Sequence, residues 1–373
     1  MLITGLGFAL ILMILLDAFE ALVLPRRITR FYRPARIYYR IAWGCWRQLA
    51  LLIPRGKYRE NTLSVFGPFS LLLLFAIWAN LLVLGFALIY FGMEIPLHPT
   101  KSVPLLSCWY MSGVTFFTLG YGDLTPGSVT GKILCVAEAG LGFGFLAIVI
   151  GYLPVLYQAF SRREQLIAIL DARASSPPTS FELLRRIGGV NEHVILDRLL
   201  FDWELWAADL LESQLSYPVL GYYRSQHDNQ SWVSTLSLIL DTSALLLSMP
   251  NSNNRYLAEL SFAMARHACV DLCLVFWLPP KHEGAERLTR EEWESFAKQN
   301  AEVAASANET KQRLDQLRAM YEPFLLSLGE YFAFRLPRFA PEGQVVDNWQ
   351  TSAWTARTPG IGHLPKSTRG RHF

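Results

Sequence analysis

A short run near the middle of the chain holds the residue types from which a protein can build a row of cation sites. It reads Thr118, Leu119, Gly120, Tyr121, Gly122 and Asp123. A dehydrated cation needs its hydration oxygens replaced by carbonyls and hydroxyls that point to one axis, whereas an ordinary strand alternates its carbonyls. Gly120 and Gly122 relieve this conflict because glycine adopts positive φ without steric cost. We expect Thr118, Leu119 and Tyr121 to keep ordinary conformations. The alternative is a simple turn, which Gly and Asp together often signal.

Apolar segments on both sides of the run favour a pore loop over a turn. A hydrocarbon core about 30 Å thick requires about 20 apolar residues. Residues 64–91 and 132–160 both exceed this length, while 104–117 is too short to span and ends at the run. The sequence therefore predicts a pore module over 62–160. It consists of an outer helix (64–91), a re-entrant pore helix (104–117), a filter (118–123) and an inner helix (132–160).

The run and its flanking helices resemble the TxGYGD selectivity filter and pore of tetrameric potassium channels, of the prokaryotic type with one pore loop per chain. The resemblance covers 62–160, about a quarter of the 373 residues. The filter positions that it implies are Thr118, Leu119, Gly120, Tyr121 and Gly122, with K+ held at the first four. Asp123 then shapes the outer mouth. The resemblance also implies a homotetramer, because one chain supplies one filter and four must ring the ion.

Two positions depart from the family pattern. Many relatives have a second threonine where this chain has Phe117, and some have a glutamate where it has Val114. Because the ion-binding positions are intact, we expect selectivity to survive both changes. Tyr110 falls where the family carries an aromatic cuff and could donate a hydrogen bond to Asp123 at the outer mouth. Alternatively, Trp109 and Tyr110 are aromatic residues of the membrane interface.

Three residues of the predicted inner helix are candidates for gating. Gly142 lies where the family has its gating glycine, and Pro154 removes a backbone hydrogen bond, so both mark places where the helix can bend. The alternative for Gly142 is close helix packing. Glu138 is costly inside a membrane. It faces either the pore cavity, where it would concentrate cations, or the pore helix, where it would accept hydrogen bonds, and the sequence leaves both open.

The charge pattern of the N-terminal part predicts the orientation in a cell membrane. Residues 1–24 form an apolar segment that we interpret as a retained transmembrane helix, followed by a basic cytoplasmic segment over 25–61. Between Pro25 and Glu60 ten Lys or Arg residues accompany one acid. The positive-inside rule then gives a multi-pass protein with three transmembrane helices, the N-terminus outside and the C-terminus in the cytoplasm. For Asp17 we favour pairing with Arg26 and Arg27 over a contact to the pore module.

Within the basic segment, residues 35–52 are typical of an interfacial helix. Its basic residues Arg36, Arg40 and Arg47 share one face. The apolar residues available to enter the bilayer are Ile37, Ile41, Trp43, Trp46 and Leu49. We therefore expect the three arginines to contact anionic membrane lipids.

The remainder of the chain is expected to be cytoplasmic. We interpret 161–179 as a linker, 180–340 as an α-helical domain and 341–373 as a disordered tail. Thr179 and Glu182 have the spacing of a capping box that opens the first helix of this domain. The polar cluster 224–230 is either a solvated loop or a ligand or intersubunit site. His267 and Asp271 are two metal-ligand types one turn apart, and a hydrogen-bonded pair is favoured over a metal site.

The sequence thus predicts an all-α membrane protein, built as a two-helix-plus-pore-loop potassium channel module with an extra N-terminal transmembrane helix and a C-terminal α-helical cytoplasmic domain. We expect a potassium-selective channel gated by the helical domain, by lipid or by both, with an unknown ligand of that domain. It is expected to have no enzyme activity, since no P-loop, nucleophile elbow or HExxH motif occurs. We expect no nucleic-acid partner and no cofactor, K+ being the permeant ion. The alternatives are a weakly selective cation channel and a membrane-anchored sensor or scaffold with a vestigial pore.

Overall fold

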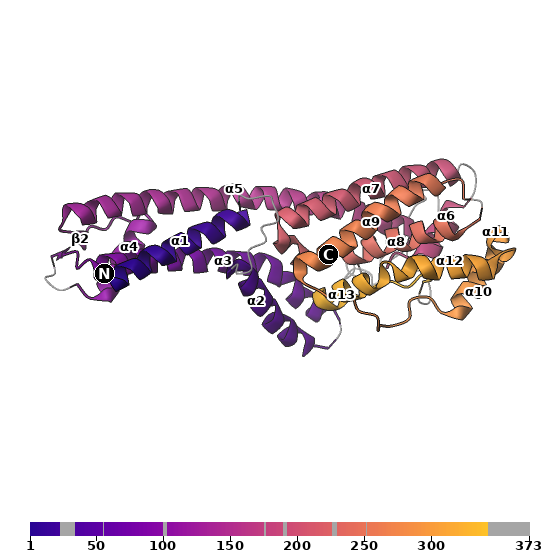
Figure 1. Cartoon of the computed structure of the whole chain (residues 1–373), viewed down its shortest axis with the longest axis horizontal. Coiled ribbons are helices and arrows are strands. Elements are labelled where there is room, and N and C mark those ends of the chain that lie inside the picture. The colour runs from indigo at the N-terminus through magenta and orange to yellow at the C-terminus, as the bar shows by residue number, and fades with distance from the viewer. Residues whose placement is uncertain are drawn as a thin grey trace, which may run out of the picture. The chain divides into compact units, whose positions relative to one another are not determined.

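The structure, a computed structural model, describes residues 1–22, 34–54, 56–99, 103–174, 177–188, 192–225, 230–250 and 252–341. These residues are almost entirely helical (Figure 1), which confirms the predicted all-α membrane protein. The chain divides into a first unit, Met1–Gln158, and a second unit that begins at Ala159. Arg26 and Arg27, and the tail beyond 341, lie outside the described residues.

The first unit holds the candidate membrane spans. Its elements are α1 (Leu2–Leu22), α2 (Pro34–Leu51), α3 (Lys57–Gly92), β1 (Leu97–His98), α4 (Leu105–Phe116), β2 (Thr125–Pro126) and the first part of α5 (Val129–Ala174). Within the described part of the chain, three helices are long and apolar enough to cross a membrane, namely α1, α3 and α5. Helix α3, the predicted outer helix, starts at Lys57, seven residues before the predicted 64. The polar residues from Lys57 to Ser64 are already helical, although they are not part of the apolar segment.

Helix α1 packs closely along α3 through glycine. A Cβ atom on Gly7 would lie 2.6 Å from the carbonyl oxygen of Gly85, and one on Gly92 would lie 2.6 Å from Thr4 Oγ1. Small residues let two membrane helices approach at backbone distance, which replaces the hydrophobic driving force that lipid removes. The extra helix is thus built onto the outer helix of the pore module.

Asp17 of α1 is buried and contacts the pore module. Its carboxylate accepts hydrogen bonds from the backbone N–H of Ala35 at 3.1 Å and from Nε1 of Trp78 at 3.0 Å. Ala35 lies in the first turn of α2, where backbone N–H groups have no partner inside the helix. The contact to the pore module considered from the sequence is therefore present, through Trp78 of α3. The favoured pairing with Arg26 and Arg27 falls on residues outside the described part of the chain and stays a prediction.

Helix α2 has the length expected of the interfacial helix, but two of its apolar residues do not face outward. Trp43 is 2% exposed, with its ring centroid 4.9 Å from that of Phe66, and Trp46 Nε1 donates to the carbonyl of Thr62 at 2.9 Å. The prediction was therefore wrong for Trp43, because the aromatic surface of α3 covers it, whereas Trp46 is half-buried. Ile37, Ile41 and Leu49 remain exposed.

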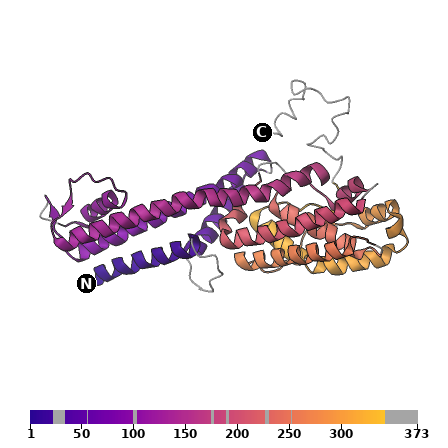
Figure 2. The ribbon, with the colours of Figure 1, turned by 90° about the horizontal axis from the view of Figure 1, so that it is seen from above.

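Helix α5 does not end at Phe160. It continues without a break to Ala174, through Pro154, so most of the segment interpreted as a linker is helical (Figures 1 and 2). The charged residues 162–164 favour a helix as readily as they favour a linker, and no proline follows until Pro177.

The second unit is a helical domain. After the end of α5 it contains α6 (Ser180–Ile187), α7 (Glu192–Ser216), η1 (Pro218–Tyr222), α8 (Trp232–Ser248), α9 (Arg255–Phe276), α10 (Arg290–Gln299), α11 (Ala301–Ala304), α12 (Ala307–Ala319) and α13 (Glu322–Phe332). Helix α8 is buried on nearly every side and forms the core, packed by α9, α12 and α6. Its buried Asp241 is satisfied by Arg287, by Tyr321 Oη at 2.7 Å and by Ser237 Oγ at 3.1 Å.

The predicted capping box at α6 is not formed. Thr179 occupies the N-cap position without a side-chain hydrogen bond, and Glu182 turns instead to Arg185 Nε at 2.7 Å and Arg186 Nε at 2.6 Å. These two guanidinium groups lower the pKa of Glu182 below its ordinary value, with the Arg185 hydrogen bond as the largest cause. Two nearby cations outcompete the backbone N–H for this carboxylate. A capping box does open α10, between Thr289 and Glu292.

Candidate functional site

The filter run begins at the carboxyl end of the short helix α4. The last turn of α4 winds directly into the run, since the N–H of Phe117 donates to the carbonyl of Gly113 at 3.1 Å and that of Leu119 to Val114 at 2.9 Å. The carboxyl end of a helix carries a partial negative charge. The run therefore starts where a helix dipole favours a cation.

The backbone of the run alternates in the sign of φ. Thr118, Gly120 and Gly122 have φ of 56°, 62° and 74°, whereas Leu119 and Tyr121 keep the usual negative values. Positive φ at the two glycines was predicted and is confirmed. The ordinary conformation expected for Thr118 was wrong. A β-branched residue at positive φ costs about 1–3 kcal/mol and persists only where its surroundings fix it, and here the N–H of Thr118 donates to Thr115 O at 3.0 Å.

Two features hold the outer end of the run. Tyr110 Oη donates to Asp123 Oδ2 at 2.9 Å, which is the hydrogen bond considered from the sequence. The segments on either side of α4 and the run pair as a two-stranded antiparallel ribbon, with Leu97 opposite Pro126 and His98 opposite Thr125. Sequence reasoning missed this ribbon, because two-residue strands carry no periodic signal.

Glu138 of α5 is 0% exposed and faces α4 rather than an open cavity. Its Oε2 accepts a hydrogen bond from Tyr90 Oη of α3 at 2.8 Å, and its Oε1 is hydrogen-bonded to Ser112 Oγ of α4. Of the two alternatives, the structure has the contact to the pore helix. Tyr90 and Ser112 were not singled out from the sequence, because a tyrosine and a serine in apolar helices carry no spacing signal of their own.

Gly142 lies against the end of α4. A Cβ at this position would lie 2.0 Å from the carbonyl oxygen of Phe116, so the close-packing alternative applies. Gly140 and Gly144, on either side, have nothing within 4 Å of such an atom. Helix α5 remains helical through Gly142 and Pro154.

Large apolar side chains of the run and of α5 are uncovered in the single chain. Leu119 and Tyr121 are 55% and 69% exposed, and only 11% of the most apolar part of α5 is buried, against 56% for α3. The uncovered residues of α5 include Val129, Ile133, Val136, Phe143, Ile150 and Tyr157.

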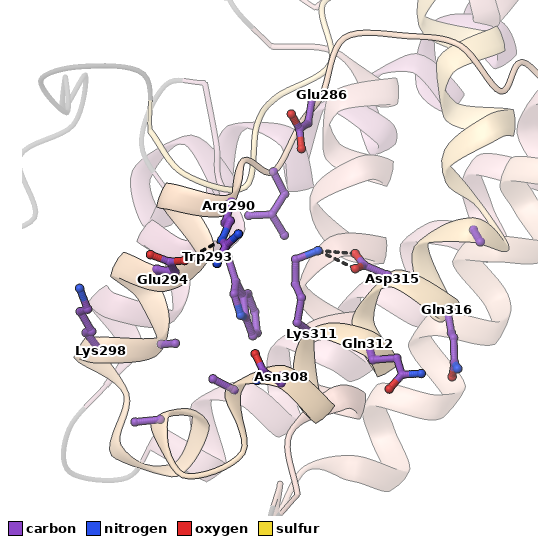
Figure 3. Close-up of a pocket in the computed structure, with 15 residues that line it drawn as sticks. Glu286, Arg290, Trp293, Glu294, Lys298, Asn308, Lys311, Gln312, Asp315 and Gln316 are labelled. Carbon is purple, nitrogen blue, oxygen red and sulfur yellow. Dashed lines mark hydrogen bonds and ion pairs between the residues drawn. The ribbon is translucent and has the colours of Figure 1, made fainter.

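The helical domain contains an open cavity of about 970 Å³ between α10, α11 and α12 (Figure 3). Trp293 and Lys311 lie on facing walls, and Lys311 Nζ is 2.6 Å from Asp315 Oδ1. Its charged lining residues are three acids and three bases, namely Glu286, Glu294, Asp315, Arg290, Lys298 and Lys311. Such a balanced lining selects no particular charge of ligand.

Two other candidate sites of this domain were considered from the sequence, the cluster 224–230 and the pair His267 and Asp271. Residues 226–229 of the polar cluster lie outside the described residues, and Arg224 Nη2 donates to the carbonyl of Phe332 at 2.7 Å. His267 Nε2 lies 3.7 Å from Asp271 Oδ2 on an exposed face. No group of three potential metal ligands occurs among the residues that the structure describes. Burial raises the pKa of Cys273 to about 12, which keeps this thiol protonated and unreactive.

Comparison with known proteins places the pore module in a family. Residues 76–158 match the family described as "Ion channel". The proteins named Protein LctB of Geobacillus stearothermophilus and of Bacillus caldotenax are each 33% identical over 84 residues, covering 20% of this chain and 62% of the relative. The chain thus spans less than two thirds of the length of these relatives. No solved structure matches this chain. The family match confirms the resemblance for this segment, and we assign residues 76–158 to the ion channel family.

Proposed function

We propose that the protein is a potassium-selective ion channel that conducts K+ passively through a homotetrameric pore. The observation that carries the proposal is the alternation of φ at Thr118, Gly120 and Gly122, between a helix end and a membrane-length helix. Alternating φ turns successive carbonyls toward one side, as a row of dehydrated K+ sites requires. In this proposal the ion ligands are Thr118, Leu119, Gly120 and Tyr121, and Gly122 completes the filter.

The tetramer is supported by the uncovered surface of the first unit. Leu119, Tyr121 and the apolar residues of α5 need partners, and three further copies would supply them around a shared axis. Four copies of this chain around one axis would bring four filter segments together, so no other type of subunit is needed. The N-terminus then lies outside and the second unit in the cytoplasm, because the basic segment before α3 favours the cytoplasmic side.

Gating by the helical domain is supported by the path of α5, which continues into that domain. Arg163, 1% exposed, is fixed there by the carbonyls of Leu220 at 2.8 Å and Tyr223 at 2.9 Å. Trp206 Nε1 donates back to the carbonyl of Arg163 at 3.1 Å. A ligand that rearranges the domain would therefore act on α5, with Pro154 as the bending point. Gly142 would take part in gating through its close contact with the end of α4, so that a movement of α5 reaches the filter segment.

Lipid is the second proposed control. Helix α2 carries Arg36, Arg40 and Arg47 beside exposed Ile37 and Ile41, and each basic residue near an anionic surface contributes about 1 kcal/mol. Neutralising the three arginines together is expected to weaken the dependence of the flux on anionic lipid. Equal flux of this variant and the unmodified protein across lipid compositions would contradict a lipid contact.

Flux into liposomes tests the channel itself. The purified chain is reconstituted, and K+ and Na+ fluxes are compared with those of Gly120→Ala, which forces a side chain onto a residue with φ of 62°. Gly144→Ala is the matched control, because neither glycine has an atom within 4 Å of the added Cβ and Gly144 has no positive φ. We expect Gly120→Ala to lose K+ flux and Gly144→Ala to retain it.

The same measurement separates the alternatives. A reversal potential that ignores the K+ gradient would favour a weakly selective cation channel. Absence of flux at every pH, voltage and lipid composition tested would contradict conduction and favour a membrane-anchored sensor or scaffold.

A further inference from the structure

Glu138 lies at the centre of a hydrogen-bonded network that joins three helices of the pore module. Tyr90 Oη of α3 lies 2.8 Å from Glu138 Oε2 and 3.3 Å from Cys135 Sγ. Ser112 Oγ of α4 is hydrogen-bonded to Glu138 Oε1 and lies 2.8 Å from the carbonyl oxygen of Val83. The network therefore runs from α5 to both α3 and α4.

The number of protons in this network is limited by its chemistry. The Val83 carbonyl can only accept, so the 2.8 Å contact uses the single proton of the Ser112 hydroxyl. The remaining contact, between Ser112 Oγ and Glu138 Oε1, then needs a proton from the carboxyl group. At the other end, the Tyr90 hydroxyl donates to Glu138 Oε2, and the Cys135 thiol can donate to Tyr90. Each of the four contacts from the Val83 carbonyl to Cys135 Sγ has one proton only when Glu138 is a neutral carboxylic acid.

Among the residues that the structure describes, no cation is hydrogen-bonded to or paired with Glu138 in a way that would stabilise a carboxylate. Its hydrogen-bond partners are the hydroxyls of Ser112 and Tyr90, and its side chain is 0% exposed. An isolated charge buried in a membrane protein is costly. The burial of Glu138 and the proton count of its hydrogen bonds therefore both indicate a neutral carboxylic acid.

The network also fixes the start of the filter. Glu138 and Gly142 are one turn apart on α5 and touch α4 at two points, Ser112 and the carbonyl of Phe116. Thr118, with its positive φ, follows two residues after Phe116. Two contacts to one short helix set both its position and its rotation.

We propose that Glu138 is a positioning residue, a neutral carboxylic acid that locks α4 to α5 and α3 and thereby holds Thr118 in the conformation that the filter needs. This role rests on the proposed channel function for its effect on selectivity. It assigns to Glu138 no contact with the permeant ion. Glutamine is the matched control, because its amide offers one acceptor oxygen to Tyr90 and one N–H donor to Ser112, as the neutral acid does.

Two measurements test the proposal. The first is an infrared spectrum of the full-length protein at pH 7, in which we expect a protonated carboxyl band that Glu138→Gln removes. The second is the K+ to Na+ permeability ratio in liposomes. We expect Glu138→Gln to remain within about twofold of the unmodified protein. Glu138→Leu removes one hydrogen-bond partner from each of two buried hydroxyls and cuts the link from α5 to α4, so we expect it to lower the ratio by about tenfold.

Absence of a protonated band assigned to Glu138 would overturn the neutral acid, and an unchanged ratio in Glu138→Leu would overturn the positioning role. If Glu138→Leu does not assemble, Tyr90→Phe provides the milder variant, expected to lower the ratio severalfold; an unchanged ratio there would equally overturn the role. If the unmodified protein conducts no ions, the proposed channel function fails, while the infrared spectrum still decides the state of Glu138.

Discussion

Two fully buried carboxyl groups, one in each unit of the chain, have opposite kinds of partner. Among the described residues, Glu138 in the pore module is hydrogen-bonded to two hydroxyls, those of Tyr90 and Ser112. Asp241 in the helical domain contacts a hydroxyl pair and the guanidinium of Arg287, which is itself 3% exposed. A buried carboxylate needs a cation, whereas a buried carboxylic acid needs only donors and acceptors in matching number. The partners therefore indicate which of the two acids carries a charge.

The largest loss of stability is expected when the ion pair between Asp241 and Arg287 is broken. Asp241→Asn leaves the buried Arg287 with one remaining ion pair among the described residues, to the Glu322 carboxylate at 3.6 Å. The free energy of unfolding should fall by about 3 kcal/mol. Thermal melting of the full-length protein in detergent measures the change.

The control for this prediction is Glu138→Gln, the same carboxyl-to-amide change at the other site. It should shift the melting temperature little, because no charge is lost there. Equal destabilisation by the two variants would contradict the contrast between a charged and a neutral acid.

A smaller loss of stability is expected at Arg163, a buried cation that is bonded to two carbonyls and paired with Glu164 at 3.0 Å. Arg163→Ala removes the donors from the Leu220 and Tyr223 carbonyls and should destabilise the domain by about 2 kcal/mol. If the proposed function holds, it should also change how often the pore opens while the K+ to Na+ ratio stays constant, because residues 118–122 are untouched. Single-channel recording separates the two quantities. The exposed Arg162→Ala is the matched control, and a parallel change in that variant would argue against a specific anchor.

Asp17 is a third buried acid, and its substitution should cost less stability than that of Arg163. Its partners include a backbone N–H and the Trp78 indole, which donate hydrogen bonds from α2 and α3. Asp17→Ala should cost about 1 kcal/mol through loss of the bond to the first turn of α2. Asp17→Asn keeps one acceptor oxygen and should cost less. Melting temperatures of both variants give the order, and the reverse order would show that the charge itself is what α2 and Trp78 require.

The smallest effect is expected at Glu182, whose partners are Arg185 and Arg186. Because these cations lower its pKa, the carboxylate stabilises α6 fully above its ordinary value of 4.5, and this contribution is lost as the pH falls through the lower folded value. At neutral pH Glu182→Gln should cost about 0.5 kcal/mol. Melting curves at pH 7 and at low pH test the sign, since the difference between the two proteins should shrink in acid. A difference that grows in acid would contradict it.

Local chemistry made some parts of the site predictable from the sequence. Positive φ at Gly120 and Gly122 could be predicted, because glycine adopts positive φ without steric cost and a row of carbonyls that point to one axis requires it. The conformation of Thr118 could not be predicted in this way, since the intrinsic preference of a β-branched residue opposes positive φ and the end of α4 overrides it. The length of α5 was underestimated for a related reason, because charged residues end a membrane span without ending a helix.

The sequence by itself determined the module: its run of filter residues, the apolar helices around it and the basic segment before it all follow from residue types and their order. Only the tertiary structure decided which way the buried acids face. Helical periodicity places Glu138 and Asp17 on a face of their own helices, but the partners on that face come from residues such as Ser112, Tyr90 and Trp78, dozens of positions away. Because the charge of a buried carboxyl depends on those partners, it is a property of the packing.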